Sequence, residues 1–271
     1  MNNLNNKVII ITGASSGIGL ACAEAFHNRG AKVALAARSA DVIKAVADKL
    51  NGKTAGRAIA IPTDVAVEED CKQLIQTVRN GFGRIDALIN NAGLSMRANF
   101  AEVNLEVLKR LMEVNFWGAV YCTKYALPYL LESKGSVVAV SSVAGLHGMP
   151  GRTGYSASKY ALQGFMDTVR IENLKKNLHV MVVVPGFVAT NIRLTALVAD
   201  GSAQGESPRK EEKMMSPEKL AEHIIRGLEK RRRRVAPSFE GRLTPVLKLL
   251  WPNLVDRLFY NHLKREPNAP L

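Results

Sequence analysis

The sequence predicts an α/β fold in which one doubly wound, mainly parallel sheet is flanked by helices on both faces. Short apolar segments rich in Val, Ile, Leu and Ala recur along the chain, and longer segments with helical periodicity separate them. Strands buried on both faces form nearly continuous apolar runs, and their alternation with helices is typical of parallel βαβ units. No repeat and no second core follow, so we expect a single domain with a C-terminal extension.

Six segments have the composition of buried strands, and five segments between them are long and periodic enough for helices. Gly30, Gly83 and Gly135 stand where helices are expected to end. The predicted strands are Val8–Thr12, Lys32–Ala37, Ala58–Thr63, Ala87–Asn90, Ser136–Ser141 and His179–Val184. The predicted helices are Ile18–Arg29, Ala40–Asn51, Glu68–Phe82, Leu105–Leu131 and Ala157–Asn177.

The alternation breaks after the sixth predicted strand. Residues 200–217 are polar and contain no strand-like run, so we expect a mobile loop here, within a lid that runs from Asn191 to about Met215. Ser216 has the character of an N-cap and Pro217 that of a first helical residue. A further helix is therefore expected from this point to about Lys230.

The chain is basic, with 37 Lys and Arg against 24 Asp and Glu and a formal net charge of +13. Residues 226–271 hold 11 basic and 4 acidic residues, so more than half of the excess lies in this extension. A basic balance favours an anionic partner such as a phosphate-rich cofactor or a membrane surface. The run Arg231–Arg234 lacks interleaved aromatic residues and a recognition motif, so we expect no nucleic-acid partner.

Cysteine use and hydropathy indicate the compartment. Cys22, Cys71 and Cys122 form neither a CxxC pair nor a disulfide framework, which favours a reducing environment. The first apolar run, Val8–Ile11, is too short for a signal peptide, and no segment offers about 18 uncharged apolar residues. We expect a cytoplasmic protein, at most peripheral at a membrane surface.

A glycine-rich segment, Thr12–Gly19, joins the first predicted strand to the first predicted helix with the pattern TGxxxGxG. Gly13 permits a sharp turn, Gly17 permits close approach of the backbone to a pyrophosphate, and Gly19 permits close packing of helix and strand. The N–H groups at the helix start favour a phosphate. The alternative is a tight strand-to-helix turn without a ligand.

The end of the second predicted strand helps to choose the cofactor. It is followed by Arg38 and Ser39, with no acidic residue before Asp41. A guanidinium suits the 2′-phosphate of NADP, whereas an acidic residue would hold the free ribose hydroxyls of NAD. Ser15 is a further donor for this phosphate. The sequence favours NADP(H), and the alternative for Arg38 is a solvated loop charge.

A tyrosine and a lysine four residues apart share one face of a predicted helix. The ammonium of Lys159 is expected to lower the pKa of the Tyr155 phenol, so that the phenol exchanges a proton nearer neutral pH. Ser142, at the end of the fifth predicted strand, offers a hydroxyl that could orient a substrate oxygen. A tyrosine and a lysine at this spacing also occur on ordinary surface helices.

Together these motifs resemble the short-chain dehydrogenase/reductase (SDR) family, in its NADP-preferring type with TGxxxGxG and YxxxK motifs. The resemblance runs from Lys7 to about Ile192 and implies a Rossmann-like fold, with residues 1–225 forming the NADP-binding and catalytic part. It rests on Thr12–Gly19, Asp64-Val65, Asn90-Asn91-Ala92-Gly93, Asn115, Ser142, Tyr155 with Lys159, and Pro185-Gly186 with Thr190.

The resemblance implies roles for these residues. Tyr155 exchanges the proton, Ser142 polarises the substrate oxygen, and Lys159 lowers the tyrosine pKa and binds the nicotinamide ribose. Asn115 sits in a local helix distortion and supports a proton relay from the lysine. The implied catalytic residues are Asn115, Ser142, Tyr155 and Lys159. The implied cofactor-binding residues are Gly13, Ser15, Ser16, Gly17, Ile18, Gly19, Arg38, Ser39, Asp64, Val65, Asn91, Ala92, Gly93, Tyr155, Lys159, Pro185, Gly186, Val188 and Thr190.

The activity implied is hydride transfer between NADP(H) and a ketone or secondary alcohol, with a homodimer or homotetramer expected. We expect a carbonyl reductase for a lipophilic substrate such as a steroid or 3-keto lipid. The alternatives are a 3-oxoacyl thioester reductase and a non-catalytic NADPH-binding regulator. The five histidines are scattered, so no metal is expected, and only His147 is placed near the predicted pocket. Arg97 is expected to be exposed or to meet an anionic substrate group.

The extension carries apolar residues at helical spacing beside basic residues. This pattern fits peripheral contact with a membrane. It also fits a stripe that packs on the body, covers the substrate cleft or meets another subunit, which is the commoner use of such a face. The stripe consists of Leu243, Val246, Leu247, Leu250, Leu254, Leu258 and Phe259, with Trp251, Lys248, Arg257, Lys264 and Arg265 nearby.

Overall fold

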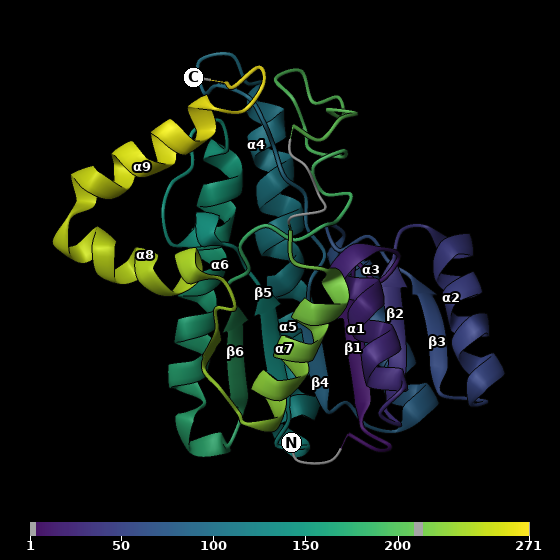
Figure 1. Ribbon diagram of the computed structural model, residues 1–271. Coiled ribbons are helices and arrows are strands. Elements are labelled where there is room, and N and C mark those ends of the chain that lie inside the picture. Colours follow the sequence, from purple (N-terminus) through teal and green to yellow (C-terminus); the bar gives the residue numbers. More distant parts are fainter. Residues whose placement is uncertain (1–3, 209–213, 271) are drawn as a thin grey trace.

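The computed structural model describes residues 4–208 and 214–270 and shows one seven-stranded sheet with helices on both faces (Figure 1). The strand order is β3-β2-β1-β4-β5-β6-β7, and every pair of neighbouring strands is parallel. This confirms the predicted α/β fold. The strands are β1 (Val8–Thr12), β2 (Lys32–Ala37), β3 (Ala58–Pro62), β4 (Ala87–Asn90), β5 (Ser136–Val140), β6 (His179–Val183) and β7 (Arg234–Val235).

The first six strands match the predicted segments to within one residue at their ends, whereas β7 was not predicted. β7 has only two residues and comes directly after three arginines, so it has no apolar run to reveal it. Its pairing is tertiary, with Arg234 opposite Val182 and Val235 opposite Val183. The sheet therefore continues into residues 226–271, and position 225 falls inside a helix, not at a boundary between units.

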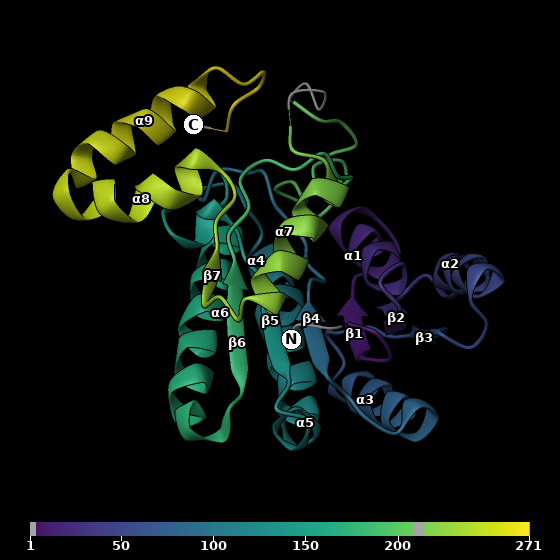
Figure 2. The same ribbon diagram turned by 60° about the horizontal axis from the view of Figure 1, so that its bottom comes forward.

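Seven helices cover the two faces of the sheet, and each face has its own apolar core (Figure 2). Alternate strand residues point to opposite faces, so Ile9 and Ile11 join one core and Val8 and Ile10 join the other. The first core contains residues of α1 (Gly17–His27), α2 (Ala40–Lys53) and α7 (Pro217–Glu229). The second contains residues of α3 (Glu68–Phe82), α5 (Gly118–Glu132) and α6 (Thr153–Glu172), and α4 (Leu105–Met112) packs against α6.

Two predicted helices differ from the structure. The segment expected as one helix over Leu105–Leu131 is interrupted by a π-helical turn at Glu113–Trp117, which separates α4 from α5. The helix expected from Ala157 begins one turn earlier, at Thr153, and the absence of a Cβ at Gly154 lets this first turn pack closely against Leu108 of α4. This earlier start places Tyr155 inside the helix.

The segment expected to be a mobile lid is partly ordered by tertiary contacts. Leu197, nearly buried, bridges to Met96 and to Ala203, and Met215 bridges to Val188. These pairings are non-local, so the polar composition of the segment does not reveal them. The part of the predicted lid at 209–213 lies outside the described residues.

The extension forms a helical hairpin of α8 (Phe239–Leu250) and α9 (Pro252–Lys264) that projects from the β6–β7 side of the sheet (Figures 1 and 2). Ser238 caps α8, and Pro252 both ends the turn and starts α9. Over the described ranges, none of the helices is long and apolar enough to cross a bilayer.

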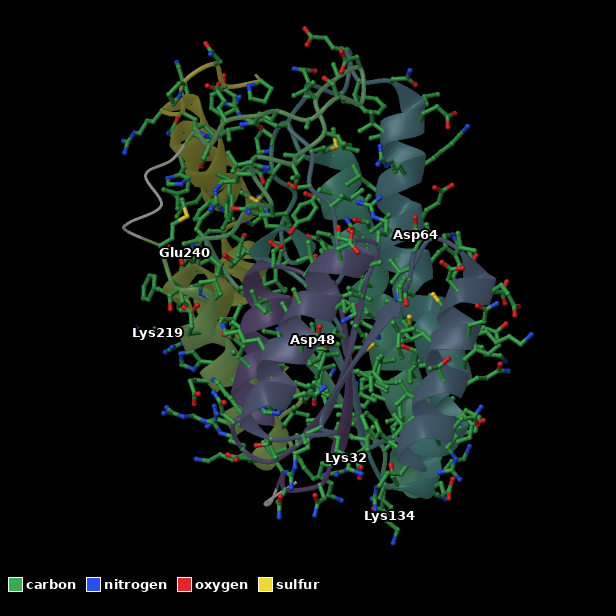
Figure 3. All side chains as sticks on the ribbon, turned by 90° about the vertical axis from the view of Figure 1, so that its right-hand side faces the viewer. Lys32, Asp48, Asp64, Lys134, Lys219 and Glu240 are labelled. Carbon is green, nitrogen blue, oxygen red and sulfur yellow. The ribbon has the colours of Figure 1, made fainter. Side chains whose placement is uncertain are left out.

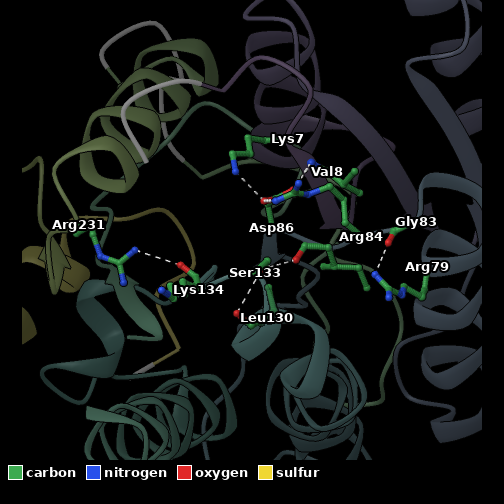
Figure 4. A network of polar contacts seen from close by, with 11 residues as sticks. Lys7, Val8, Arg79, Gly83, Arg84, Asp86, Leu130, Ser133, Lys134 and Arg231 are labelled. Carbon is green, nitrogen blue, oxygen red and sulfur yellow. Dashed lines mark hydrogen bonds and ion pairs between the residues drawn. The ribbon is translucent and has the colours of Figure 1, made fainter. Parts of the chain in front are cut away.

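A buried carboxylate organises the edge of the sheet opposite the carboxyl ends of the strands (Figure 4). Asp86, just before β4, accepts hydrogen bonds from Lys7 Nζ (3.0 Å), from the Val8 backbone N–H (3.0 Å) and from Arg84 Nη2 (2.6 Å). Burial raises the pKa of Asp86, but the hydrogen bonds from Arg84, Val8 and Lys7 outweigh it, and the pKa is lowered overall. The ionised form therefore ties β1 to β4.

We expect Asp86→Ala to lower the free energy of unfolding by about 3 kcal/mol, because it leaves two cations and a buried N–H without their acceptor. The pKa is lowered in the folded state, so this stabilisation is present above the unfolded pKa of about 4 and is lost as the pH falls through the folded value. Urea unfolding at several pH values measures both effects. Asp48→Ala, which breaks only the exposed pair with Lys44, is the control and is expected to change little.

Candidate active site

A cavity of about 790 Å³ opens at the carboxyl ends of the parallel strands, where open α/β sheets bind ligands. Figure 3 shows its two borders, Asp64 and Glu240, far from Lys32 and Lys134 at the other end of the sheet. Every predicted site residue except Gly19 and Asn115 lines it: Gly13, Ser15, Ser16, Gly17, Ile18, Arg38, Ser39, Asp64, Val65, Asn91, Ala92, Gly93, Ser142, Tyr155, Lys159, Pro185, Gly186, Val188 and Thr190.

The glycine loop has the shape of a cradle for an anion. Gly13 has φ +67°, and a Cβ there would lie 2.9 Å from the Cα of Ala92. A Cβ on Gly19 would lie 2.2 Å from the carbonyl oxygen of Gly13, so Gly19 allows α1 to pack on the loop and does not itself reach the cavity. The N-cap of α1, Ser16, makes no capping bond through its side chain, and no acidic residue occupies the first turn. The positive end of α1 therefore faces the cavity, as phosphate binding requires.

The ends of β2 and β3 supply the next part of the cavity. Arg38 follows β2 directly, and Ser39 is the N-cap of α2 and makes no capping bond through its side chain. Asp64 follows β3, and its Oδ1 accepts a hydrogen bond from the backbone N–H of Ala66 (3.0 Å). A cation beside the end of β2 is compatible with a nucleotide that carries an additional phosphate on the adenosine ribose.

The structure brings Ser142, Tyr155 and Lys159 together on one wall of the cavity. Ser142 follows β5, while Tyr155 and Lys159 lie one turn apart near the start of α6. Lys159 is nearly buried, and its Nζ donates a hydrogen bond to the carbonyl oxygen of Val140 (2.9 Å) and lies 5.8 Å from the centroid of the Tyr155 ring. The three side chains thus form a single polar group at the end of β5.

The expectation of a lowered tyrosine pKa is not met in the structure. Burial raises the pKa of Tyr155, and a hydrogen bond from Ser142 and the charge of Arg152 offset this only in part. Burial also lowers the pKa of Lys159 to about 8. The sequence reveals that a lysine stands one turn away, but it does not reveal that Lys159 is buried and Tyr155 half-buried. At neutral pH the phenol keeps its proton and can act as a donor.

Asn115 lies behind the cavity wall and not on it. It sits in the π-helical turn, so the local helix distortion implied by the family resemblance is present. Its Oδ1 accepts a hydrogen bond from the backbone N–H of Leu94 (2.7 Å), and its Nδ2 donates to the Leu94 carbonyl (2.9 Å) and to Ser158 Oγ (2.9 Å). The π turn places this amide between two elements, where it fixes the loop after β4 against α6. In the structure Asn115 is a positioning residue.

The C-terminal hairpin forms a second wall that the predicted site did not include. The only sequence signal was the apolar stripe, of which part faces inward and part faces outward. Of the two histidines His147 and His262, His262 lines the cavity and His147 does not, which corrects the expectation that only His147 lies near it. The hairpin residues on this wall are Phe239, Glu240, Leu243, Thr244, Leu247, Val255, Leu258, Phe259 and His262.

Polar contacts hold the hairpin against the body. His147 Nε2 lies 3.2 Å from Asp256, and Lys248 Nζ donates hydrogen bonds to Tyr160 Oη (2.6 Å) and to the carbonyl oxygen of Leu146 (3.1 Å). The loop that follows Ser142 is therefore attached to both helices of the hairpin.

The last residues cover the loop after β4. Arg97 was expected to be exposed or to meet substrate, but its side chain is 9% exposed and lies 3.6 Å from the carboxylate of Glu266. Pro270 packs on Gly151, where an added Cβ would lie 2.4 Å from the proline ring. These contacts are between segments far apart in sequence, so no local pattern predicts them.

A cationic residue that the predicted site did not include also faces the cavity. Arg152 is nearly buried and donates hydrogen bonds from Nη1 to Ser95 Oγ (3.1 Å) and to the Met96 carbonyl (3.0 Å). Its charge lowers the pKa of Tyr155 in part. A single arginine in a loop carries no sequence signal for such a position.

Comparison with known proteins agrees with this geometry. A family model described as short chain dehydrogenase matches residues 7–197. The mouse protein "Dehydrogenase/reductase SDR family member 7B" is 33% identical over 268 residues, covering 97% of this chain and 83% of that protein. "11-beta-hydroxysteroid dehydrogenase A" of Arachis hypogaea is 36% identical over 278 residues, covering 99% of this chain and 78% of that protein.

A solved structure is also similar. The alcohol dehydrogenase from the archaeon Thermococcus sibiricus, complexed with 5-hydroxy-NADP, has a TM-score of 0.73 and 29% sequence identity, and the match covers 86% of this chain and 94% of that one. The sheet topology and the matches along the sequence lead to the same assignment. The chain belongs to the short-chain dehydrogenase/reductase family and is an oxidoreductase with a nucleotide-binding Rossmann fold.

Proposed function

We propose that the protein is an NADP(H)-dependent carbonyl reductase that converts a ketone of a lipophilic substrate into a secondary alcohol. One observation carries the proposal: Ser142, Tyr155 and Lys159 meet on one wall of a cavity that apolar side chains of the C-terminal hairpin also line. The polar wall offers a proton donor and a hydrogen-bonding partner for an oxygen atom. The apolar wall offers a surface for a hydrocarbon body.

The residues of the polar wall divide the work of ketone reduction. A bound NADPH would supply the hydride that adds to the carbonyl carbon. Tyr155 donates its phenolic proton to the carbonyl oxygen, and Ser142 holds that oxygen by a hydrogen bond as negative charge develops on it. The ammonium of Lys159 stabilises the phenolate that is left. The glycine loop, Arg38 and Asp64 would hold the nucleotide.

A lipophilic substrate is supported by the lining of the hairpin wall. Leu243 and Leu247 of α8 and Val255 and Phe259 of α9 face the cavity. Burial of apolar substrate surface against such side chains contributes about 25 cal/mol per Å². One similar protein is described as an 11-beta-hydroxysteroid dehydrogenase, which is consistent with a steroid-like or 3-keto lipid substrate.

The preference for NADP rests on Arg38. We expect Arg38→Ala to raise the Kd for NADPH by about tenfold or more, because it removes a charge-assisted contact with the 2′-phosphate, and to leave the weaker binding of NADH nearly unchanged. Fluorescence titration with both nucleotides measures this. Arg110→Ala, an exposed arginine on α4 that does not line the cavity, is the matched control. Equal losses for NADPH and NADH in Arg38→Ala would count against the 2′-phosphate contact.

A screen of NADPH consumption tests the proposed function. The panel contains ketosteroids, 3-keto lipids, 3-oxoacyl thioesters and small water-soluble ketones, each with NADPH and with NADH. Turnover of the apolar ketones with NADPH at a higher kcat/KM than that of the small ketones is the expected result. Tight NADPH binding without oxidation by any ketone would instead indicate a regulatory protein, and preference for the thioesters would indicate a 3-oxoacyl reductase.

A further inference from the structure

The turn between α8 and α9 projects away from the sheet (Figure 2), and exposed apolar side chains surround it, which we call the apolar ridge. Leu249 is 82% exposed, and Leu250 and Trp251 are each 56% exposed. Contiguous apolar side chains at a projecting turn mark a site of interaction with another apolar phase or molecule. The ridge consists of Val246, Leu249, Leu250, Trp251 and Leu254.

The apolar residues of the hairpin extend beyond the part of its surface that lines the cavity. On α8, Leu243 and Leu247 face the cavity, whereas Val246 is 54% exposed. On α9, Val255 and Phe259 face the cavity, whereas Leu254 is 48% exposed. An amphipathic helix that packs on its own protein needs a single apolar face. The apolar side chains that remain exposed, such as Val246 and Leu254, require another explanation.

The charges around the ridge fit an anionic surface. The seven residues Leu249–Val255 carry no charge, and between 239 and 265 there are five Lys and Arg against two Asp and Glu. One of the two acids, Asp256, is paired with His147. Leucine and tryptophan at an apex with cations on the flanks are the residues of segments that lie in the interface of an anionic bilayer.

The ridge is also continuous with the mouth of the cavity. Leu258 is 52% exposed and Phe239 is 74% exposed, yet both line the cavity. Leu258 follows Leu254 of the ridge by one helical turn on α9, so it lies between the ridge and the cavity. A hydrocarbon chain that passes Leu258 would stay in contact with apolar atoms.

We propose that the apolar ridge docks the protein on an anionic lipid bilayer, so that the cavity receives its ketone from the membrane. The route of substrate entry rests on the proposed function, whereas docking itself does not. The cations that flank the ridge favour an anionic lipid surface over a second copy of this basic chain.

The first experiment measures docking without turnover. The chain has two tryptophans, Trp117 and Trp251, so Trp117→Phe leaves Trp251 as the sole reporter. With phosphatidylserine/phosphatidylcholine vesicles we expect co-flotation of the protein, a blue shift of Trp251 emission and quenching by brominated lipids. Phosphatidylcholine vesicles alone are expected to bind about tenfold less, because the electrostatic attraction is missing. Absence of flotation and of a shift with the anionic vesicles would overturn the proposal.

The second experiment uses the double variant Leu249→Glu/Trp251→Glu, whose residues do not line the cavity. We expect its vesicle partitioning to fall by about tenfold or more, because two charges enter the apolar ridge. The matched control is Leu105→Glu/Leu174→Glu, since both of these leucines are 64% exposed and lie outside the hairpin. The control is expected to bind vesicles as the wild type does. Equal loss in the two variants would contradict a role for the ridge.

Two further measurements, ketone reduction and light scattering, distinguish lipid docking from failure of the proposed function and from self-association. The ridge variant is expected to reduce a water-soluble ketone at the wild-type rate and a vesicle-borne ketone much more slowly. If no ketone is reduced by any variant, the proposed function fails, while flotation still decides whether the ridge docks on lipid. If light scattering shows that the ridge variant turns an oligomer into monomers, and vesicles do not bind the wild type, a second copy is the occupant and the proposal is wrong.

Discussion

Replacement of Tyr155 by phenylalanine is expected to lower kcat for ketone reduction by about 100- to 10,000-fold, the range over which a positioned proton donor contributes. The phenylalanine ring fills nearly the same volume on the wall of the cavity, so the nucleotide site keeps its shape. What is lost is the hydroxyl that gives its proton to the carbonyl oxygen. The Kd for NADPH, measured by fluorescence titration, is expected to stay within about twofold of the wild type, because phenylalanine retains the ring.

The control for this variant is Tyr160→Phe. Tyr160 lies on the same helix, and its hydroxyl contacts Lys248 and not the cavity. The Tyr160→Phe variant is expected to keep most of the wild-type activity. Activity of Tyr155→Phe close to that of the wild type would show that the phenol is not the proton donor and would rule out the proposed mechanism.

Lys159→Met is expected to lower kcat/KM by about 100-fold or more, since the phenolate formed at Tyr155 loses its neighbouring charge. Methionine has nearly the shape of the lysine stem. Burial lowers the pKa of Lys159 to about 8, so for wild-type ketone reduction we expect kcat/KM to fall as the pH rises through about 8 and the ammonium is lost. The alkaline fall should be absent from the pH profile of Lys159→Met.

The thermal stability of Lys159→Met shows whether a loss of activity reflects lost catalysis or a damaged fold. The pKa of Lys159 is lower in the folded state than in the unfolded state, so below about pH 8 the folded protein bears the cost of a buried charge that the unfolded chain does not. Removal of the charge relieves this cost, although the Val140 carbonyl loses its donor. We expect the Tm of Lys159→Met at pH 7 to equal or exceed that of the wild type. A lower Tm together with lost activity would point to a structural role.

Local features of the sequence predict the framework of this protein well. Strands β1, β2, β4, β5 and β6 are buried on both faces and the edge strand β3 is half-buried, which makes each a nearly continuous apolar run. The glycine loop is recognisable because Gly13 and Gly19 occupy positions where a Cβ would meet backbone atoms. Strand β7 escapes prediction since its two residues are in a strand only through pairing with β6. The π-helical turn was implied by the family resemblance and not by the periodicity, which continues over 105–131 on both sides of it.

In the candidate site, too, some residues were predicted from the sequence and others are known only from the structure. Ser142, Tyr155 and Lys159 were predicted from residue type and spacing together with the family resemblance, and all three line the cavity. The direction of the Tyr155 pKa was wrong, because burial depends on what the rest of the chain places around the ring. The hairpin wall and Arg152 come from segments far from the motifs in sequence, so no spacing rule could include them.

Residue type and periodicity are local properties, and they determined the parallel α/β sheet, the glycine loop at its first turn and the identity of the polar groups at the carboxyl ends of the strands. Burial and contact between distant segments are global properties, and only the tertiary structure decided them. It buried Lys159, half-buried Tyr155, moved Asn115 behind the cavity wall, and turned part of the C-terminal stripe toward the cavity and part toward solvent. The apolar stripe was visible in the sequence, but the sides of α8 and α9 are told apart only by what each side touches.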